Sequence, residues 1–378
     1  MTDIQPFEIA IAESELDDLR ARLAMTRLPE AETTGDWSQG IPLSYIREIL
    51  DYWQTGYDWR RGEARINQFP QFRTELDGVG IHFIHVRSPE PDAMPLVMTH
   101  GWPGSVVEFL KVIEPLSNPR AHGGNAEDAF HVVCPTLPGF GFSGKPTTTG
   151  WGTEKIGGEW ARLMARLGYG RYVAQGGDWG SIVTGAIADA DPEHCAAIHL
   201  NMPIAPPDPA TMDSLTEREQ VALAALKHYQ DWDSGYSKQQ STRPQTVGYG
   251  LVDSPIGQAA WILEKFWAWM DCDGHPENVL TRDELLDNVM LYWLTASGAS
   301  SARIYWESFN SSRPETISVP TGISQFPKEI FPTSRRWAEK RFSNLIYYNE
   351  LDKGGHFAAF EQPEQFVAEL RDCFRQVR

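Results

Sequence analysis

The chain has 378 residues, of which 41% are hydrophobic and 22% charged, as in an ordinary globular protein with one large domain or two smaller ones. Its formal net charge is -18, and the 33 lysines and arginines are scattered, which argues against binding to nucleic acid or to an anionic membrane. The four cysteines lie far apart without a metal-binding spacing, and neither an export signal nor a membrane-spanning apolar run is evident, so we expect a cytoplasmic protein with reduced thiols.

The first 71 residues are predicted to form a helical arm. Leucines at positions 16, 19 and 23 recur at helical spacing among charged residues. Apolar and aromatic residues recur in the same way over residues 42–59. Because this segment is rich in aromatic residues, we expect it to pack against a larger body.

From residue 72 the pattern becomes that of a sheet. The segment FRTELDGVGIHFIHVRS alternates apolar and polar residues on both sides of a glycine-containing turn, which predicts a β-hairpin. Short apolar runs that end in glycine or proline then alternate with helix-length stretches at residues 106–116 and 155–167. This alternation predicts βαβ units and a mostly parallel sheet with catalytic residues at the carboxyl ends of its strands.

A helical block interrupts this pattern. Residues 206–313 are rich in large side chains and contain no convincing buried strand, whereas strand-like segments return at TISVPTGIS and NLIYYNEL, before a last helix over residues 363–375. We therefore expect an α/β core in two parts, residues 72–205 and 314–378, with an inserted helical lid between them.

The motif GGDWGS has the form of a nucleophile elbow, with Asp178 between two glycines at the junction of a predicted strand and helix. The alternative is that Asp178 only caps the following helix. The motif HGWPGS follows an earlier strand. In α/β-hydrolases such a turn, together with the residue after the nucleophile, supplies the backbone N–H groups of an oxyanion hole, here those of Trp102 and Trp179.

His356 is the candidate base, because it alone among the ten histidines lies in a loop between the last predicted strand and the last helix. The acid that orients it is expected in a loop after a late strand. Glu329 in SQFPKEIF fits this position. Asp352 is the alternative, although its closeness to His356 along the chain constrains its geometry.

An aspartate nucleophile indicates attack on saturated carbon. An aspartate side chain has an ordinary pKa of about 4 and needs no base to become a nucleophile. The product of its attack is an alkyl ester, which water activated by His356 and Glu329 then hydrolyses. The leaving group is either halide, which needs weak donors such as indole N–H, or an epoxide oxygen, which needs a proton. The predicted lid carries both kinds of donor, namely Trp232, Trp261, Trp267, Trp269, Tyr229, Tyr236 and Tyr249.

Motifs along nearly the whole chain stand in the order of one known family: GYDWRRGEARINQFPQF, DGVGIHFIH, HGWPGS, LPGFGFSGKP, GGDWGS, STRPQTVGYGLVDSPIGQAAWILEKF and GGHFAAFEQPE. The sequence resembles the epoxide hydrolases that carry an N-terminal extension, a branch with microsomal, insect juvenile-hormone, fungal and bacterial members. The resemblance implies an α/β-hydrolase fold, with a mostly parallel eight-stranded sheet, an N-terminal helical arm and a helical lid.

The resemblance also implies roles for individual residues. Asp178 would be the nucleophile, His356 the base and Glu329 the acid. Two tyrosines would open the ring: Tyr236, just before the STRP motif, and Tyr305 in SSARIYWES. The expected reaction hydrolyses an epoxide to a vicinal diol without a metal or organic cofactor.

The expected partners are a small apolar epoxide and water, with no nucleic acid and no membrane anchor, and the sequence leaves open whether the chain forms a homodimer. Two alternatives to the epoxide hydrolase remain. One is a haloalkane dehalogenase that uses the same aspartate, and the other is a catalytically silent α/β-hydrolase that only binds its ligand.

Overall fold

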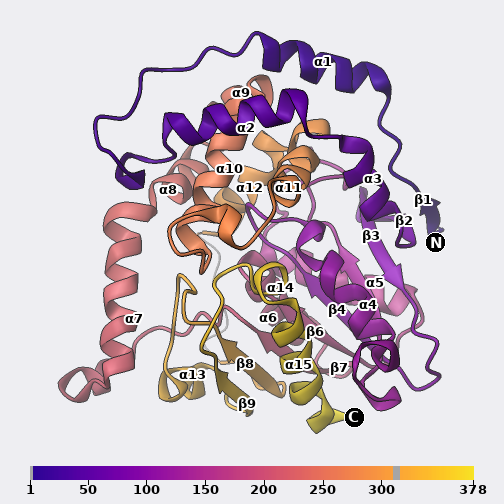
Figure 1. The fold of residues 1–378 in the computed structure, drawn as a ribbon. Coiled ribbons are helices and arrows are strands. Elements are labelled where there is room, and N and C mark those ends of the chain that lie inside the picture. Colours follow the sequence, from indigo (N-terminus) through magenta and orange to yellow (C-terminus); the bar gives the residue numbers. More distant parts are fainter. Residues whose placement is uncertain (1–2, 310–315) are drawn as a thin grey trace.

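The computed structural model describes residues 3–309 and 316–378, which are built around a nine-stranded sheet with the order β1-β2-β3-β5-β4-β6-β7-β8-β9 (Figure 1). The contacts among β1, β2, β3 and β5 are antiparallel, and all later contacts are parallel. The strands are β1 (Gln5–Phe7), β2 (Gln71–Leu76), β3 (Val79–Val86), β4 (Met94–Thr99), β5 (Phe130–Pro135), β6 (Tyr172–Gly176), β7 (Cys195–Leu200), β8 (Thr321–Gln325) and β9 (Leu345–Glu350).

This sheet confirms the predicted α/β-hydrolase fold and adds one strand to the eight predicted. The additional strand is β1, which pairs with β2 at the edge of the sheet. It has three residues, too few to show an alternating pattern. The predicted hairpin is formed by β2 and β3, and β6 at the centre is buried along its whole length, as expected of a parallel strand covered on both faces.

Two pairs of helices cover the sheet. α5 (Thr153–Arg166) packs against α6 (Trp179–Ala190), and α4 (Leu110–Ser117) packs against α15 (Pro363–Phe374) (Figure 1). α4 continues a short 3-10 helix, η2 (Val106–Phe109), so the predicted helix over residues 106–116 begins in this tighter form. Because β4, β6 and β8 run in the same direction, the loops that follow them lie at the same edge of the sheet.

The lid is helical, as expected. The end predicted for it, residue 313, lies outside the described residues. α12 packs against α8 and α9, and α10 against α9 and α11. The elements of the lid are η5 (Pro209–Ser214), α7 (Glu217–His228), the π-helical turn η6 (Tyr229–Asp233), α8 (Gly235–Thr242), α9 (Pro244–Asp253), α10 (Pro255–Trp269), η7 (Pro276–Asn278), α11 (Arg282–Leu294) and α12 (Gly298–Ser308).

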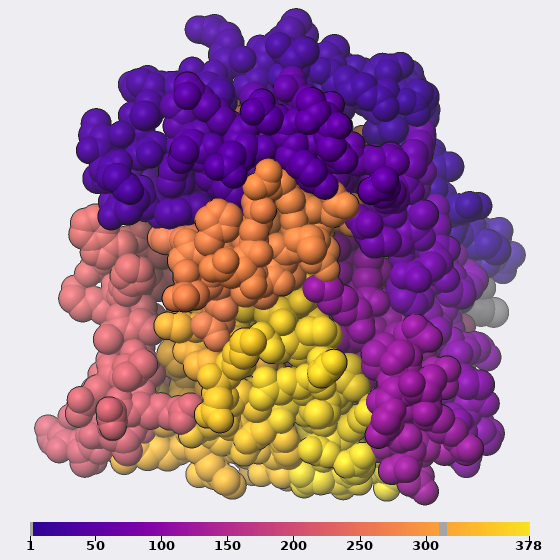
Figure 2. All heavy atoms as spheres, in the orientation of Figure 1, coloured from indigo at the N-terminus to yellow at the C-terminus, as the bar shows by residue number. Residues whose placement is uncertain are grey.

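The N-terminal arm lies across the lid, as Figure 2 shows for its indigo atoms above the orange ones. The predicted helix over residues 42–59 is divided in two, because α2 (Leu43–Thr55) ends at Gly56 and α3 (Trp59–Asn67) starts after the N-cap Asp58. α1 (Glu13–Ala24) and α2 contact α10, and α3 contacts α11. The larger body against which the arm packs is thus mainly the lid.

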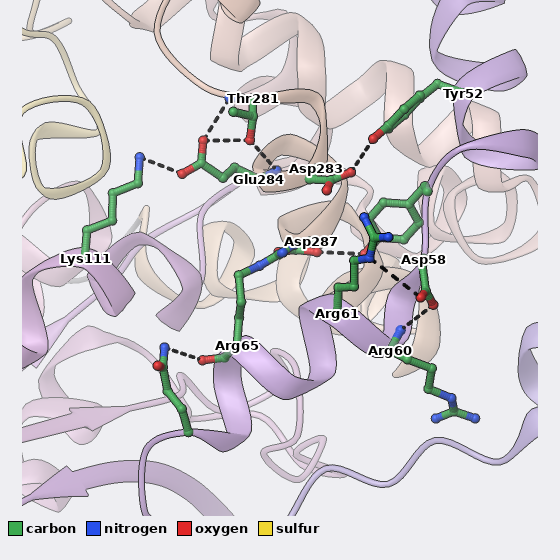
Figure 3. Close-up of polar contacts among 12 residues, drawn as sticks. Tyr52, Asp58, Arg60, Arg61, Arg65, Lys111, Thr281, Asp283, Glu284 and Asp287 are labelled. Atoms are coloured by element: carbon green, nitrogen blue, oxygen red, sulfur yellow. Dashed lines mark hydrogen bonds and ion pairs between the residues drawn. The ribbon is translucent and has the colours of Figure 1, made fainter.

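Polar contacts fasten the arm to α11 (Figure 3). The Tyr52 hydroxyl donates to Asp283 Oδ1 at 2.6 Å, and the Tyr57 hydroxyl donates to Asp287 Oδ1 at 2.8 Å. Arg65 forms an ion pair with the same Asp287. No helix in the described part of the chain is both long enough and apolar enough to cross a membrane.

Candidate active site

Asp178 lies at the corner between β6 and α6 in a strained backbone conformation, with φ 50° and ψ -130°. A Cβ atom at Gly180 would lie 1.8 Å from the carbonyl oxygen of Thr99, so this tight corner requires glycine. The Asp178 side chain forms no capping hydrogen bond with α6. Its carboxylate is therefore free to face the site, and the helix-cap alternative does not describe it.

One oxygen of Asp178 is held by the turn after β4. The Trp102 N–H donates to Asp178 Oδ1 at 2.8 Å. A Cβ atom at Gly101 would lie 2.1 Å from the same oxygen, so only glycine allows this approach. Trp179 is the first residue of α6, and its N–H is one of the amides that a helix leaves unpaired in its first turn. Its part in an oxyanion hole stays a prediction.

The lid helix α11 fixes this turn from the other side. The Ser105 hydroxyl donates to Asn288 Oδ1 at 2.7 Å, and Asn288 Nδ2 donates to the Pro103 carbonyl at 2.8 Å. The Tyr292 hydroxyl donates to the Gly104 carbonyl at 2.7 Å. Asn288 and Tyr292 could not be predicted from the sequence, because only the folded chain brings α11 next to the HGWPGS turn.

His356 stands between two carboxylates. Its Nδ1 lies 2.8 Å from Glu329 Oε1, and its Nε2 lies 3.4 Å from Asp178 Oδ2. The side chains of His356 and Glu329 are 2% and 0% exposed. Asp352 is exposed to solvent, and Glu329 is the carboxylate that contacts His356 Nδ1. His356 thus lies between the residues predicted to be the nucleophile and the acid, and the three catalytic roles stay a prediction.

The charges around His356 favour its protonated form. Burial lowers the pKa of His356, but Glu329 and Asp178 outweigh burial and hold that pKa well above its ordinary value. The protonated form of His356 is therefore favoured while both carboxylates face it. Loss of the negative charge of Asp178 would lower this pKa.

Both predicted tyrosines extend from the lid toward Asp178 and line the same cavity as its side chain. Tyr236 comes from α8 and Tyr305 from α12, and their ring centroids lie 5.6 Å apart at 83°. Trp102 stacks on Tyr236 at 5.0 Å, and Trp179 packs edge-on against Tyr305 at 4.8 Å. Burial raises the pKa of both tyrosine hydroxyls well above its ordinary value, so both stay protonated and can donate.

The two hydroxyls differ in their hydrogen bonds. The Tyr236 hydroxyl lies 3.3 Å from the Tyr229 hydroxyl, which donates to Ser237 Oγ at 3.1 Å. The Tyr305 hydroxyl lies close to Tyr236 and Trp179 but forms no hydrogen bond of ordinary geometry within the described residues. A buried hydroxyl without a partner is available to a ligand.

A cavity of about 620 Å³ joins these groups. Asp178, Tyr236 and Tyr305 all line it, and most of its remaining wall is apolar. A small apolar molecule in this cavity would meet the carboxylate and both hydroxyls. The apolar and aromatic part of the wall includes Trp179, Ile182, Met202, Ile204, Leu226, Phe309, Phe331 and Trp337.

The lid indoles named as candidate halide donors do not line the substrate cavity. Trp261 Nε1 donates to Gln240 Oε1 at 2.9 Å, Trp267 Nε1 to the Gly274 carbonyl at 3.1 Å, and Trp269 Nε1 to Asp233 Oδ2 at 2.5 Å. Trp232 is 82% exposed. The lid therefore offers hydroxyl donors to the cavity and keeps these indole donors away from it.

Comparisons with known proteins give matches over nearly the whole chain. A family model described as "Epoxide hydrolase N terminus" matches residues 4–109, and one described as "alpha/beta hydrolase fold" matches residues 94–245. A putative epoxide hydrolase of Stigmatella aurantiaca is 57% identical over 376 residues, which cover 99% of this chain and 86% of that protein.

Two further proteins extend the comparison. Epoxide hydrolase 1 of Sus scrofa is 36% identical over 398 residues, which cover 97% of this chain and 88% of that protein. The crystal structure of juvenile hormone epoxide hydrolase from the silkworm Bombyx mori superposes with a TM-score of 0.91 at 32% identity. The match covers 100% of this chain and 95% of that one.

Proposed function

The chain belongs to the epoxide hydrolases of the α/β-hydrolase fold, and we propose from this premise that it hydrolyses an epoxide to a vicinal diol through an ester of Asp178. One observation carries the proposal. The two oxygens of Asp178 have different partners, since Oδ1 accepts from the Trp102 N–H and Oδ2 lies toward His356. Both tyrosines line the cavity into which this carboxylate faces.

In the first step Asp178 Oδ2 attacks a ring carbon of the epoxide. The carbon–oxygen bond of the ring breaks as the ester bond forms. The ring oxygen takes its proton from Tyr236 or Tyr305, two of the three tyrosines that line the cavity. The hydroxyl of the third, Tyr229, donates to Ser237 Oγ. Oδ1 stays on the Trp102 N–H and becomes the carbonyl oxygen of the ester.

In the second step His356 becomes the base. Alkylation removes the negative charge of Asp178, which is one of the two charges that hold the pKa of His356 high. With that pKa lowered, His356 first gives its Nε2 proton to the tyrosine that lost one. Nε2 then accepts a proton from water as the water oxygen adds to the Asp178 carbonyl carbon. As the ester bond breaks, His356 passes this proton to the leaving alkoxide oxygen, which completes the diol. The remaining proton of the water goes from the Asp178 carboxyl group to Nε2, so that the resting charges are restored.

The oxyanion of this second step forms on Oδ1. The Trp102 N–H already points at this oxygen in the resting site, so no reorganisation is needed when charge develops there. The Trp179 N–H would be the second donor. Glu329 keeps Nδ1 of His356 as the donor, which leaves Nε2 to work on the water.

The substrate class follows from the cavity and its donors. The apolar wall favours a small apolar epoxide. The lid indoles do not line the cavity, which argues against halide as the leaving group.

The cytoplasmic location that the sequence predicts is consistent with the state of the cysteines. All four are buried free thiols, namely Cys134, Cys195, Cys272 and Cys373.

Steady-state assays with styrene oxide and with a haloalkane test this function. We expect vicinal diol from styrene oxide and no halide from the haloalkane. The Asp178→Asn variant is the matched control and should form no diol. Halide release without diol would favour the dehalogenase, and binding of both compounds without turnover would favour a silent hydrolase.

A further inference from the structure

A small polar chamber adjoins the Asp178–His356 pair and is distinct from the substrate cavity. Its volume is about 20 Å³, enough for one water molecule. Among the described residues, only Asp178 lines both the chamber and the substrate cavity. His356 lines the chamber but not the substrate cavity. The chamber therefore reaches the carboxylate and the base by a route that does not pass through the substrate cavity.

Two buried polar atoms at this chamber lack a partner. Thr99 at the end of β4 and Gln175 in β6 both line it and are 0% and 1% exposed. Thr99 Oγ1 and Gln175 Oε1 have no hydrogen-bond partner within residues 3–309 and 316–378. Gln175 Nε2 donates to Asn201 Oδ1 at 2.8 Å, which leaves its carbonyl oxygen as the free group. Buried polar atoms without a protein partner are the usual ligands of an internal water.

Glu108 from η2 supplies a carboxyl group to the same chamber. Its Oε1 lies so close to Gly104 that a Cβ atom there would be 1.5 Å away, and this close approach requires glycine in the HGWPGS motif. Burial is the main cause that raises the pKa of Glu108 to about 8. The His356 charge opposes this rise, and the Asp178 charge adds to it. At neutral pH the group is mainly a neutral acid, with one acceptor oxygen and one O–H donor.

We propose that Glu108 is a positioning residue that holds the hydrolytic water in this chamber, beside His356 Nε2 and the carbonyl carbon of the Asp178 ester. The inference rests on the function proposed above. The water gives one hydrogen to His356, directs its other hydrogen to the Glu108 carbonyl oxygen, and adds through its own oxygen to the ester. Glu108 keeps its proton throughout, so it orients the water without taking part in proton transfer.

A separate water site has a consequence for the order of events. The water does not compete with the epoxide for the apolar cavity, and it is already in place when the ester forms. Loss of Glu108 should therefore slow ester hydrolysis and leave alkylation unchanged. A side chain that only supported the fold would affect both steps.

The test is single-turnover kinetics with styrene oxide on two variants of the full chain. Glu108→Gln keeps the size of the side chain and its acceptor carbonyl, whereas Glu108→Leu keeps only the size. We expect alkylation within about twofold of wild type in both, and ester hydrolysis slowed about tenfold or more in Glu108→Leu but restored to within about threefold in Glu108→Gln. The alkyl-enzyme should accumulate in Glu108→Leu, as seen by mass spectrometry.

Glu114→Leu is the control, because Glu114 lies on α4 with its side chain 63% exposed. It should behave as wild type. Unchanged ester hydrolysis in Glu108→Leu, or an equal loss in both steps, would overturn the inference. Should Glu108→Leu fail to fold, Thr99→Val removes another hydrogen-bonding group of the chamber, and unchanged ester hydrolysis in that variant would overturn it equally.

These outcomes are distinct from a failure of the proposed function. If no variant, including one that lacks the base, ever carries an alkyl group on Asp178, the ester mechanism itself is wrong. If the ester forms but Glu108 does not affect its hydrolysis, only the water site is wrong.

Discussion

At Asp178 the two carboxylate oxygens are set apart before any substrate arrives. Oδ1 is held by a backbone amide, and Oδ2 faces the imidazole 3.4 Å away. The strained φ of 50° at this residue places the carboxylate above the sheet, where both contacts can form. These different contacts support the proposal that Oδ2 attacks the substrate and that Oδ1 carries the charge that develops in the second step.

Substitution of the two tyrosines tests ring opening. Tyr236→Phe and Tyr305→Phe should each slow alkylation about tenfold to a hundredfold, because each removes a proton donor to the ring oxygen. The double variant should be slower than either. Rapid-quench measurement of the alkyl-enzyme gives these rates.

Tyr249→Phe is the control for this series, since Tyr249 is 68% exposed and does not line the cavity. Its alkylation rate should equal that of wild type. Unchanged alkylation in both Tyr236→Phe and Tyr305→Phe would mean that other groups open the ring.

Motifs with a fixed local geometry could be predicted from the sequence, whereas groups placed by tertiary contacts could not. Asp178 and Trp102 lie in turns whose glycines show in the sequence. The choice between Glu329 and Asp352 needed the folded loops, because both follow predicted strands. The proposed role of Glu108 could not be predicted from the sequence, because it depends on the burial of this side chain and on neighbours from β4 and β6.

At the scale of elements, charged contacts hold the lid to the core. Glu219 on α7 accepts from Arg336 Nε on α13 (Arg335–Arg341) at 2.5 Å and from the Ser334 hydroxyl at 2.7 Å. The Glu219 side chain is 0% exposed. These hydrogen bonds from Arg336 and Ser334 to the buried Glu219 carboxylate hold one end of α7 against the core.

This contact predicts an acid-sensitive contribution to stability. The hydrogen bond from Arg336 outweighs burial and lowers the pKa of Glu219 to about 2. Because the folded pKa lies below the unfolded value, the contribution is complete above about pH 4.5 and is lost as pH falls toward 2. Glu219→Gln should lower the thermal midpoint by about 2–6 °C at pH 7.

The difference between wild type and Glu219→Gln should shrink as pH falls, down to the lowest pH at which both are folded. Scanning calorimetry over this range measures it. Glu339→Gln, which alters an exposed pair with Arg335 on the same helix, should show little effect at any pH. A difference independent of pH would contradict the assignment of the lowered pKa to Glu219.

Elements with a long periodic pattern could be predicted from the sequence, and their exact limits could not. α1 and α15 match the predicted helices closely. β1 was missed because three residues give no period, and its pairing with β2 joins segments that lie far apart in the sequence. The break at Gly56 was missed because the apolar spacing continues across it.

At the scale of the whole molecule, the site is closed by layers from different parts of the chain. The core supplies Asp178, His356 and Glu329, and the lid supplies Tyr236 and Tyr305. The arm packs against the lid (Figures 1 and 3). The ion pair of Arg65 with Asp287 and the hydrogen bonds of Asn288 lie on one helix, α11, which contacts both the arm and the HGWPGS turn. The chemistry therefore depends on the docking of all three parts.

The most direct measurement of the ester mechanism is mass spectrometry of the His356→Gln variant mixed with styrene oxide. Alkylation needs only Asp178 and the tyrosines, whereas ester hydrolysis needs the base, so the first step should proceed and the second should stall. The result we predict is a stable adduct with the mass of one epoxide on the peptide that contains Asp178. An unmodified Asp178, with the label on another residue or on none, would contradict the account.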